Sequence, residues 1–232
     1  MKSFVHSIAL VLVLSYTSLF SQANSNYDGP KPEVYAGAKS FVFYYTPFQS
    51  NFEPVYVASS SYASFGNDFG SIDLYGAGFR YFVTNQIALG FGVNFGTAST
   101  DQDIEGVGTL NQSATTIGVG IDANYHLKSL YGISPYLGVN VNFGTYSASD
   151  DDVDEGNEIV TTDYSGNGFG AGVQFGFDWF FTEGISLGGK YALGFRSLGK
   201  SEINEPDGVT VEGPSTTQFG ISTFSVILNV HI

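Results

Sequence analysis

Between Gly168 and Phe195 the sequence alternates bulky apolar residues with glycine and a few polar residues. One set of positions carries Phe169, Ala171, Val173, Phe175, Phe177, Trp179 and Phe181, and the positions between them carry Gly168, Gly170, Gly172, Gln174, Gly176 and Asp178. The alternation resumes after Thr182-Glu183-Gly184 and continues to Arg196. A period of two residues is typical of a β-strand, because successive side chains point to opposite faces. The short link between the two segments predicts a hairpin.

The sizes of the residues on the two faces favour a membrane barrel over a soluble sheet. A soluble sandwich would bury the large face and show ordinary polar residues on the other. Here the other face is mostly glycine, which weakens a strand unless something approaches closely on that side. A small closed barrel gives a reason, because its interior is only just wide enough for side chains. We therefore expect the aromatic face to contact lipid and the glycine face to line a narrow lumen.

The same alternation recurs along most of the chain. It predicts strands within residues 34–46, 71–83, 87–97, 113–127, 135–147, 168–181, 185–196 and 218–232. The connections between them alternate in length, and the long ones are 47–70, 98–111, 148–164 and 198–217. An up-and-down barrel with both ends of the chain on one side has this order of connections. The prediction is an all-β fold, an eight-stranded antiparallel up-and-down transmembrane β-barrel over residues 34–232.

The first 33 residues have a different character. Residues 1–23 contain Lys2, an apolar run and a final Ser21-Gln22-Ala23, which together predict a secretory signal peptide. The apolar run is too short to span a bilayer. Residues 24–33 are polar and contain Pro30 and Pro32, and we expect them to form a periplasmic lead-in. With the barrel pattern, this predicts the outer membrane of a Gram-negative bacterium, with its lipid as the immediate partner.

The charge of the chain excludes several classes of partner. The formal net charge is −14, and loss of Lys2 with the signal peptide would make it −15. This argues against binding to nucleic acid and against electrostatic attraction to anionic lipid. The chain has no cysteine, so it has neither a disulfide nor the cysteine that a lipoprotein anchor needs.

The segment Arg80–Val93, which reads R-Y-F-V-T-N-Q-I-A-L-G-F-G-V, resembles the small outer-membrane barrel family. That family includes the transmembrane domain of outer-membrane protein A and outer-membrane protein X, and the resemblance is closest to its Bacteroidetes-type porin members. The resemblance implies the barrel-assembly machinery as a partner during insertion. Family members commonly end in an aromatic residue that this machinery reads, whereas the present chain ends in Ile232.

Several polar and charged residues fall on the predicted lumen face. They are Arg80, Asp122, Asp178, Lys190, Arg196, Asn94, Asn140 and Gln174. A charge inside a barrel is costly unless it is paired or hydrated. These residues therefore predict either an ion-pair and hydrogen-bond network that closes the lumen or the lining of a selective pore. Eight strands leave little free bore, which favours the closed network.

Two acidic stretches in the predicted loops are candidate metal sites. Asp101, Asp103 and Glu105 begin a calcium-loop pattern, but its twelfth position holds Gln112, where a bidentate glutamate is expected. Asp150, Asp152 and Asp154 belong to a denser acidic cluster that suits weak calcium binding. The favoured interpretation is a solvated acidic loop, and no cofactor is predicted.

No catalytic residue is predicted. His126 and His231 are the histidines that remain after the signal peptide, and neither belongs to a recognisable motif. Asp122 shares a strand face with His126 but lies about 13 Å away along it. The leading hypothesis is a non-enzymatic envelope protein with a porin-like or surface-interaction role and an unknown extracellular partner. The alternatives are a small diffusion channel and a lipid A-modifying enzyme, because lipid A deacylases use this fold with Ser-His chemistry.

Overall fold

The computed structural model describes residues 28–49, 72–154, 156, 158–205 and 208–232. The predicted signal peptide and most of the long connection 47–70 lie outside these residues. Nowhere in the described part does a helix reach the length and apolarity that a membrane crossing needs.

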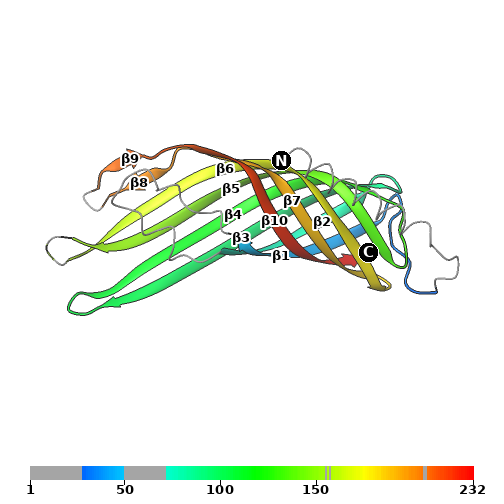
Figure 1. Cartoon of the computed structure of the whole chain (residues 1–232), viewed down its shortest axis with the longest axis horizontal. Helices are drawn as coiled ribbons and strands as arrows, with labels where there is room; N and C mark the ends of the chain where they lie inside the picture. The colour runs from blue at the N-terminus through cyan, green and yellow to red at the C-terminus, as the bar shows by residue number, and fades with distance from the viewer. Residues whose placement is uncertain (1–27, 50–71, 155, 157, 206–207) are drawn as a thin grey trace, which may run out of the picture.

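The regular elements of the described residues are ten strands (Figure 1). They are β1 (Lys39–Gln49), β2 (Ile72–Phe82), β3 (Ile87–Ile104), β4 (Gly108–His126), β5 (Ile133–Val153), β6 (Ile159–Thr182), β7 (Ile185–Leu198), β8 (Glu202–Asn204), β9 (Thr210–Glu212) and β10 (Thr216–His231). Eight of them form one closed ring in the order β1-β2-β3-β4-β5-β6-β7-β10, with every neighbouring pair antiparallel and β10 paired back to β1. The predicted barrel is therefore confirmed.

The two faces of the barrel wall differ in exposure as the sequence pattern predicts. Phe91, Val139 and Phe175 on the outside are 55%, 55% and 53% exposed. Gln174 and Asp178 on the inside are 2% and 1% exposed. A soluble β-sheet protein would bury its phenylalanines, so this inverted distribution is the one expected of a wall that faces hydrocarbon.

Close approach between neighbouring strands explains the glycines of the lumen face. A Cβ atom added at Gly172 would lie 2.7 Å from the carbonyl oxygen of Leu193 on β7. A Cβ atom at Gly188 would lie 2.7 Å from the carbonyl oxygen of Phe177 on β6. At these positions the obstacle to a side chain is therefore the backbone of the adjacent strand, in addition to the narrowness of the lumen.

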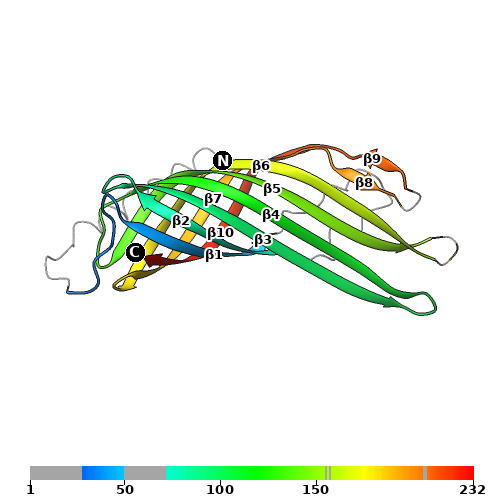
Figure 2. The ribbon, with the colours of Figure 1, turned by 180° about the vertical axis from the view of Figure 1, so that it is seen from behind.

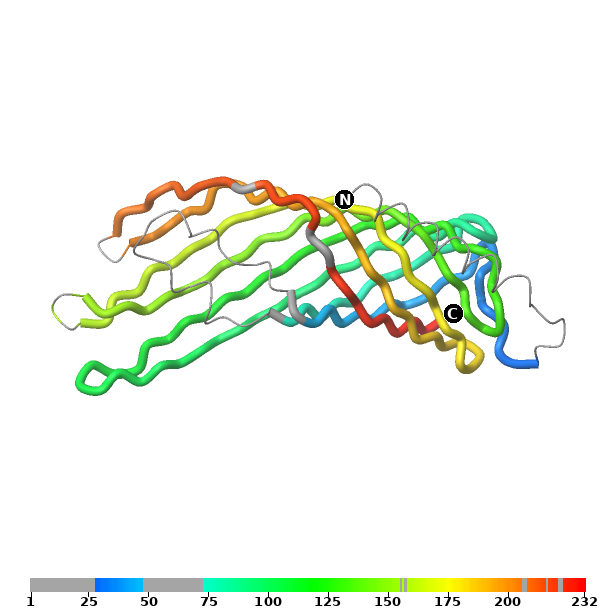
Figure 3. Tube along the Cα trace, viewed as in Figure 1, coloured from blue at the N-terminus to red at the C-terminus, as the bar shows by residue number. Residues whose placement is uncertain are grey.

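The long acidic connections were wrongly predicted as loops. Residues 98–111 form the outer parts of β3 and β4, which stay in register from Phe95 opposite Ile117 to Ile104 opposite Gly108. Residues 148–164 likewise belong mostly to β5 and β6, whose register continues to Val153 opposite Ile159. Figure 3 shows these hairpins projecting from one end of the barrel. The 21 residues of β5 extend ~70 Å at about 3.3 Å per residue. Roughly 10 residues are enough to cross a membrane, so β5 is about twice as long as a crossing requires.

Two other connections also differ from expectation. Residues 198–217 contain the hairpin of β8 and β9, which pairs with the outer part of β6 through Asp163 opposite Asn204. The first strand begins at Lys39, five residues later than the predicted bound, and Lys39 is exposed at the outer surface. Its aliphatic stem can lie along apolar surface while its ammonium reaches water.

Residues 28–36, which include the described part of the lead-in, cross the end of the barrel that carries the short turns, visible from behind in Figure 2. We take this end as the periplasmic one, since short turns face the periplasm in such barrels. Glu33 Oε1 accepts a hydrogen bond from Gly184 N at 2.9 Å, in the β6–β7 turn. Ala36 N donates to Asn85 Oδ1 at 2.9 Å, in the β2–β3 turn. These two turns lie on opposite sides of the ring, so residues 33–36 span the opening.

A β-bulge changes the phase of the last strand. The pairing of β10 with β7 shifts between Phe219 and Ile221, and Gly220 between them has φ of +78°. Phe219 and Phe224 are 80% and 50% exposed, although one position is odd and the other even. The extra residue thus lets side chains on both sides of the bulge point outward.

Candidate functional site

An ion pair lies inside the barrel near its short-turn end. Arg80 Nη1 on β2 is 2.6 Å from Asp178 Oδ2 on β6, and the side chains are 5% and 1% exposed. Asn229 Nδ2 donates to Asp178 Oδ1 at 3.0 Å and also to Ser186 Oγ at 3.0 Å. The guanidinium carbon of Arg80 lies 5.6 Å from the centre of the Tyr136 ring. Both buried charges therefore have a partner of opposite charge and further polar or aromatic contacts.

Aromatic rings complete the closure at the same end. The ring centres of Phe82 and His126 are 4.8 Å apart, those of His126 and Tyr136 are 5.1 Å apart, and those of Phe180 and His231 are 4.8 Å apart. All five side chains are at most 8% exposed. We call the eight residues of this region the lumen plug; they are Arg80, Phe82, His126, Tyr136, Asp178, Phe180, Asn229 and His231.

Each histidine of the lumen plug forms a hydrogen bond with a serine. His126 Nδ1 is 2.9 Å from Ser134 Oγ, and His231 Nε2 is 3.1 Å from Ser186 Oγ. Both serines are 0% exposed, so no external substrate can reach either hydroxyl in this conformation. Asp122 does not join His126, because its carboxylate accepts a hydrogen bond from Asn124 instead. These pairs fit packing of the plug better than nucleophilic attack.

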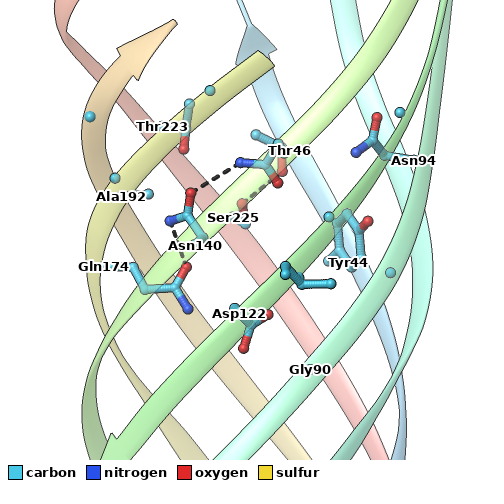
Figure 4. Close-up of a pocket in the computed structure, with 18 of the residues that line it drawn as sticks. Tyr44, Thr46, Gly90, Asn94, Asp122, Asn140, Gln174, Ala192, Thr223 and Ser225 are labelled. Carbon is cyan, nitrogen blue, oxygen red and sulfur yellow. Dashed lines mark hydrogen bonds between the residues drawn. The ribbon is translucent and has the colours of Figure 1, made fainter.

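A chain of side-chain amides runs across the wall above the plug, that is, on the side of the plug toward the projecting hairpins. Asn142 Nδ2 donates to Asn140 Oδ1 at 3.0 Å, and Asn140 Nδ2 donates to Gln174 Oε1 at 3.0 Å (Figure 4). Gln174 Nε2 donates to Asn124 Oδ1 at 2.6 Å, and Asn124 in turn donates to Asp122. The chain connects β4, β5 and β6, and each amide in it fixes the orientation of the next.

A cavity of about 260 Å³ occupies the lumen above the plug. Its floor includes Arg80, and its wall reaches Tyr146 and Leu198 near the outer end of the barrel. Figure 4 shows Asp122 and Tyr44 on this wall. Asn142 is exposed although it faces the lumen, so solvent enters the cavity. The buried plug separates the cavity from the short-turn end.

The structure distributes the predicted lumen residues between these regions. Arg80 and Asp178 belong to the plug, and Gln174 belongs to the amide chain. Asn140 also belongs to the amide chain, and it lines the cavity together with Asn94, Asp122, Lys190 and Arg196. Arg196 Nη2 donates to Gln218 Oε1 at 2.8 Å.

Sequence reasoning missed the aromatic part of the plug. Phe82 and Phe180 are each two residues beyond a predicted lumen charge, Arg80 and Asp178, so they share its face. Their position on the lumen face, in step with these charges, could have identified them from the sequence. An aromatic residue in the lumen phase near a short turn indicates closure of the barrel at that turn.

The acidic residues of the hairpins bind neighbouring donors. Asp150 Oδ1 accepts from Gln112 Nε2 at 2.8 Å, and Asp154 Oδ1 accepts from the backbone N–H groups of Gly156 and Glu158 at 2.8 and 2.9 Å. Asp152 Oδ1 accepts from Val153 N at 2.8 Å. Over the described residues, no three His, Cys, Asp or Glu side chains come together in a group that could hold a metal ion. The calcium prediction gains no support from this arrangement.

The pKa of Asp150 is raised to about 6, chiefly because partial burial removes water from its carboxylate. The hydrogen bond from Gln112 acts in the opposite direction, and the negative charges of Asp152 and Asp151 raise the pKa further. Asp150 lies on the outer part of β5, beyond the segment that crosses the membrane.

Comparison with known proteins identifies the same architecture. A family model described as the outer membrane protein beta-barrel domain matches residues 9–223. The chain is similar to a major outer membrane protein from Thermus thermophilus, with a TM-score of 0.53 and 13% identity over 84% of this chain and 99% of that one. It is also similar to OprG from Pseudomonas aeruginosa, with a TM-score of 0.50 and 13% identity over 89% of this chain and 99% of that one.

At these identities the likeness concerns the fold alone. The outer membrane protease OmpT from Escherichia coli matches with a TM-score of 0.41 and 11% identity over 84% of this chain and 92% of that one, which is too distant to bear on function. No curated protein matches the chain significantly.

Proposed function

The chain belongs to the outer membrane protein beta-barrel family, and on that basis we propose that it is a non-enzymatic outer-membrane protein whose closed barrel anchors an extracellular interaction surface. The observation that carries the proposal is the lumen plug. The Arg80–Asp178 pair and the surrounding rings occupy one end of the lumen. That lumen is already narrow, because a barrel of eight strands has an interior only just wide enough for side chains. A barrel filled in this way supports anchorage better than it supports diffusion.

The second part of the proposal rests on the outward side of the projecting hairpins. Cross-strand pairing aligns short polar and acidic side chains in rows across six strands. One row is Thr97, Thr115, Ser147, Ser165, Glu202 and Glu212, and the next is Ser99, Ser113, Ser149, Asp163, Asn204 and Thr210. We call these two rows, with Asp101 and Asp151 beyond them, the outer hairpin face.

The chemistry of the outer hairpin face favours a basic partner. Its side chains are hydroxyls, amides and carboxylates. Lys200 pairs with Glu212, and the other carboxylates of the face have no lysine or arginine partner among the described residues. Opposite charge accelerates encounter and discriminates against acidic partners. We therefore propose a cationic polypeptide or cationic surface as the extracellular partner.

Binding of refolded protein in lipid discs to a lysine homopolymer tests this surface. Asp101→Asn, Asp151→Asn and Asp163→Asn together should weaken binding at physiological salt, and a glutamate homopolymer should not bind. Glu183→Gln is the matched control, because Glu183 is an exposed acid in the short turn at the opposite end of the barrel. The triple variant removes three charges and the control removes one, so a control effect one third as large would assign the binding to net charge and remove the hairpin face from the proposal.

Planar-bilayer recording tests the closed barrel. The wild-type protein should show no conductance above background, whereas the double variant Arg80→Ser and Tyr136→Ser should conduct, which shows that the assay detects an opened lumen. Steady wild-type conductance would favour the alternative of a small diffusion channel. That alternative is suggested by the cavity, which already reaches Arg80 from the outer side.

A lipid A-modifying enzyme is the second alternative. It requires a serine and a histidine at the lipid surface, and Ser134 and Ser186 are both buried in the lumen. Mass spectra of lipid A from cells with and without the protein should be identical. A protein-dependent change in acyl content would overturn the non-enzymatic proposal.

A further inference from the structure

We propose that the lumen cavity above the plug binds a small zwitterionic solute, with the carboxylate of the solute on Lys190 and its ammonium group on Asp122. This goes beyond the proposed surface role, and it needs no conduction, because the plug closes the cavity below. The inference starts from two opposite charges that share the cavity without pairing with each other.

Lys190, on β7, is the first of these charges. Its Nζ lies 5.7 Å from the centre of the Tyr44 ring on β1, and its side chain lines the cavity. The ion pairs among the described residues are Arg80–Asp178 and Lys200–Glu212, so Lys190 has no carboxylate oxygen within 4.0 Å. A contact with a ring face satisfies part of the charge but none of the three N–H donors of the ammonium group. These donors are available to an anionic group in the cavity.

Asp122, on β4, is the second charge. One of its oxygens, Oδ1, accepts from Asn124, which leaves Oδ2 available to the cavity. The carboxylate lies over Gly90 of β3, where a Cβ atom would come within 2.7 Å of Oδ2. Glycine at position 90 therefore leaves the space that the carboxylate occupies. An ammonium group is the natural partner for the free oxygen.

The surroundings favour a solute that is neutral overall. Arg80 in the floor is already neutralised by Asp178. The hairpins outside the lumen carry many carboxylates, and Lys200 is the only lysine or arginine between residues 199 and 217. A net anion is repelled by these hairpins, and a simple cation meets Lys190 and Arg196 within the cavity. A molecule with one charge of each sign avoids both penalties.

The cavity also has the size and the polar groups that such a solute needs. Its volume of about 260 Å³ is slightly below the roughly 300 Å³ at which the usual range of small-molecule sites begins, so it suits only a small solute. Much of the wall is glycine, and Gly92 and Gly120 leave the space that the Tyr44 and Asn142 side chains occupy beside the cavity. The amide chain through Asn140 and Asn142 supplies further donors and acceptors along one side.

Titration of the folded wild-type protein in lipid discs tests the proposal. The probes are glycine, β-alanine and γ-aminobutyrate, which separate the two charges by increasing distances, with acetate and ethylammonium as single-charge controls. We expect saturable binding of at least one zwitterion, at least tenfold tighter than either control, with shifts in the amide resonances of Gly92 and Gly120. Absence of saturable zwitterion binding, or equal binding of acetate, would overturn the proposal without variants.

Substitutions assign the two ends of the solute. Lys190→Met should weaken zwitterion binding by about tenfold or more, the loss expected for a hydrogen bond to a charged group. Asp122→Asn should weaken zwitterion binding similarly but leave acetate binding unchanged or improved. Lys200→Met is the control and should change neither, because Lys200 is exposed outside the barrel. Unaltered zwitterion binding by folded Lys190→Met protein would also overturn the proposal; if that variant does not fold, Lys190→Gln replaces it.

Discussion

At the scale of single residues, the Arg80–Asp178 pair is the contact on which closure of the lumen depends most directly. Both side chains are almost fully buried, and desolvation of two charges is costly. The cost is offset by the 2.6 Å contact between them and by Asn229, which donates to the free oxygen of Asp178. Removing one charge leaves the other without compensation.

Arg80→Met should therefore lower the free energy of unfolding by about 3–5 kcal/mol. Urea unfolding from lipid vesicles, followed by the fluorescence of Trp179, the single tryptophan of the chain, measures this change. The exposed pair Lys200–Glu212 supplies the control, and Lys200→Met should have no measurable effect. Similar losses in both variants would show that burial of the inner pair is not what matters.

The sequence predicted which residues share the lumen but not how they pair. Alternation placed Arg80, Asp178 and Lys190 on one face of the wall. Strand tilt and the curvature of the ring decide which of them meet, and a one-dimensional pattern carries neither quantity. Arg80 and Asp178 come together, whereas Lys190 packs against Tyr44. The partners of a lumen charge therefore require the three-dimensional register.

At the scale of the elements, β10 shows how one extra residue changes which alternate positions of a strand point outward. Gly220 adopts a left-handed backbone conformation and adds one position, so that Phe219 stays outward. Without the extra residue, Phe219 would point into the lumen. The bulge was hard to predict from the residues alone, because the simple alternation from Phe224 to Ile232 begins only after it.

Substitution of Gly220 should destabilise the barrel according to how poorly the new residue tolerates a positive φ. Gly220→Val should cost more than about 1 kcal/mol, because a β-branched side chain is unfavourable there, and Gly220→Asn should cost less. The temperature at which each refolded variant changes its mobility in gel electrophoresis gives the order of stability. Equal stability of the two variants would show that the positive φ at position 220 is not the cause of the destabilisation.

The β5–β6 hairpin should respond to pH through Asp150. The pKa of this acid is raised to about 6 in the folded protein, so its protonated form is favoured by folding. Its contribution to stability is fully present below the ordinary aspartate pKa of about 3.9 and is lost as the pH rises through about 6. Amide exchange near Asp150, corrected for the intrinsic rate, should be slower at pH 5 than at pH 7.5. The Asp150→Asn variant should lose this difference, and its persistence there would assign it to another group.

The extent of the strands was the least predictable property of the elements. The alternation of large and small residues ends near Phe95 and Phe143, where the wall leaves the hydrocarbon. Beyond these residues both faces meet water, so the size contrast disappears although the ladder continues through Thr97 opposite Thr115. Backbone pairing needs no contrast between faces, which is why the hairpins were mistaken for loops.

At the scale of the whole molecule, the fold was predictable because a single physical constraint acts on every strand. Each crossing strand must show apolar residues to lipid and small or polar residues to the lumen. From this constraint follow the number of strands, their direction and the outward residues. The plug and the cavity were less predictable, since they depend on which inward side chains reach across the ring.

The depth dependence of the outer surface tests the orientation of the whole molecule. Phe91→Arg should lower the free energy of unfolding by about 2–4 kcal/mol, because Phe91 lies at the middle of the lipid-facing part of β3. Thr97→Arg, six residues further along the same face, should have little effect. Urea unfolding from vesicles measures both, and a larger loss at Thr97 would place the membrane around the hairpins instead.

The segment from Glu33 to Ala36 has a consequence for the order in which the molecule forms. Gly184 and Asn85, which hold Glu33 and Ala36, are brought to opposite sides of one opening only when Ser40 has paired with His231 and the ring is complete. Interactions absent from the folding transition state act on the rate of unfolding and not on the rate of folding. The hydrogen bonds of Glu33 and Ala36 thus form late, and they would prolong the lifetime of the finished barrel without hastening its assembly.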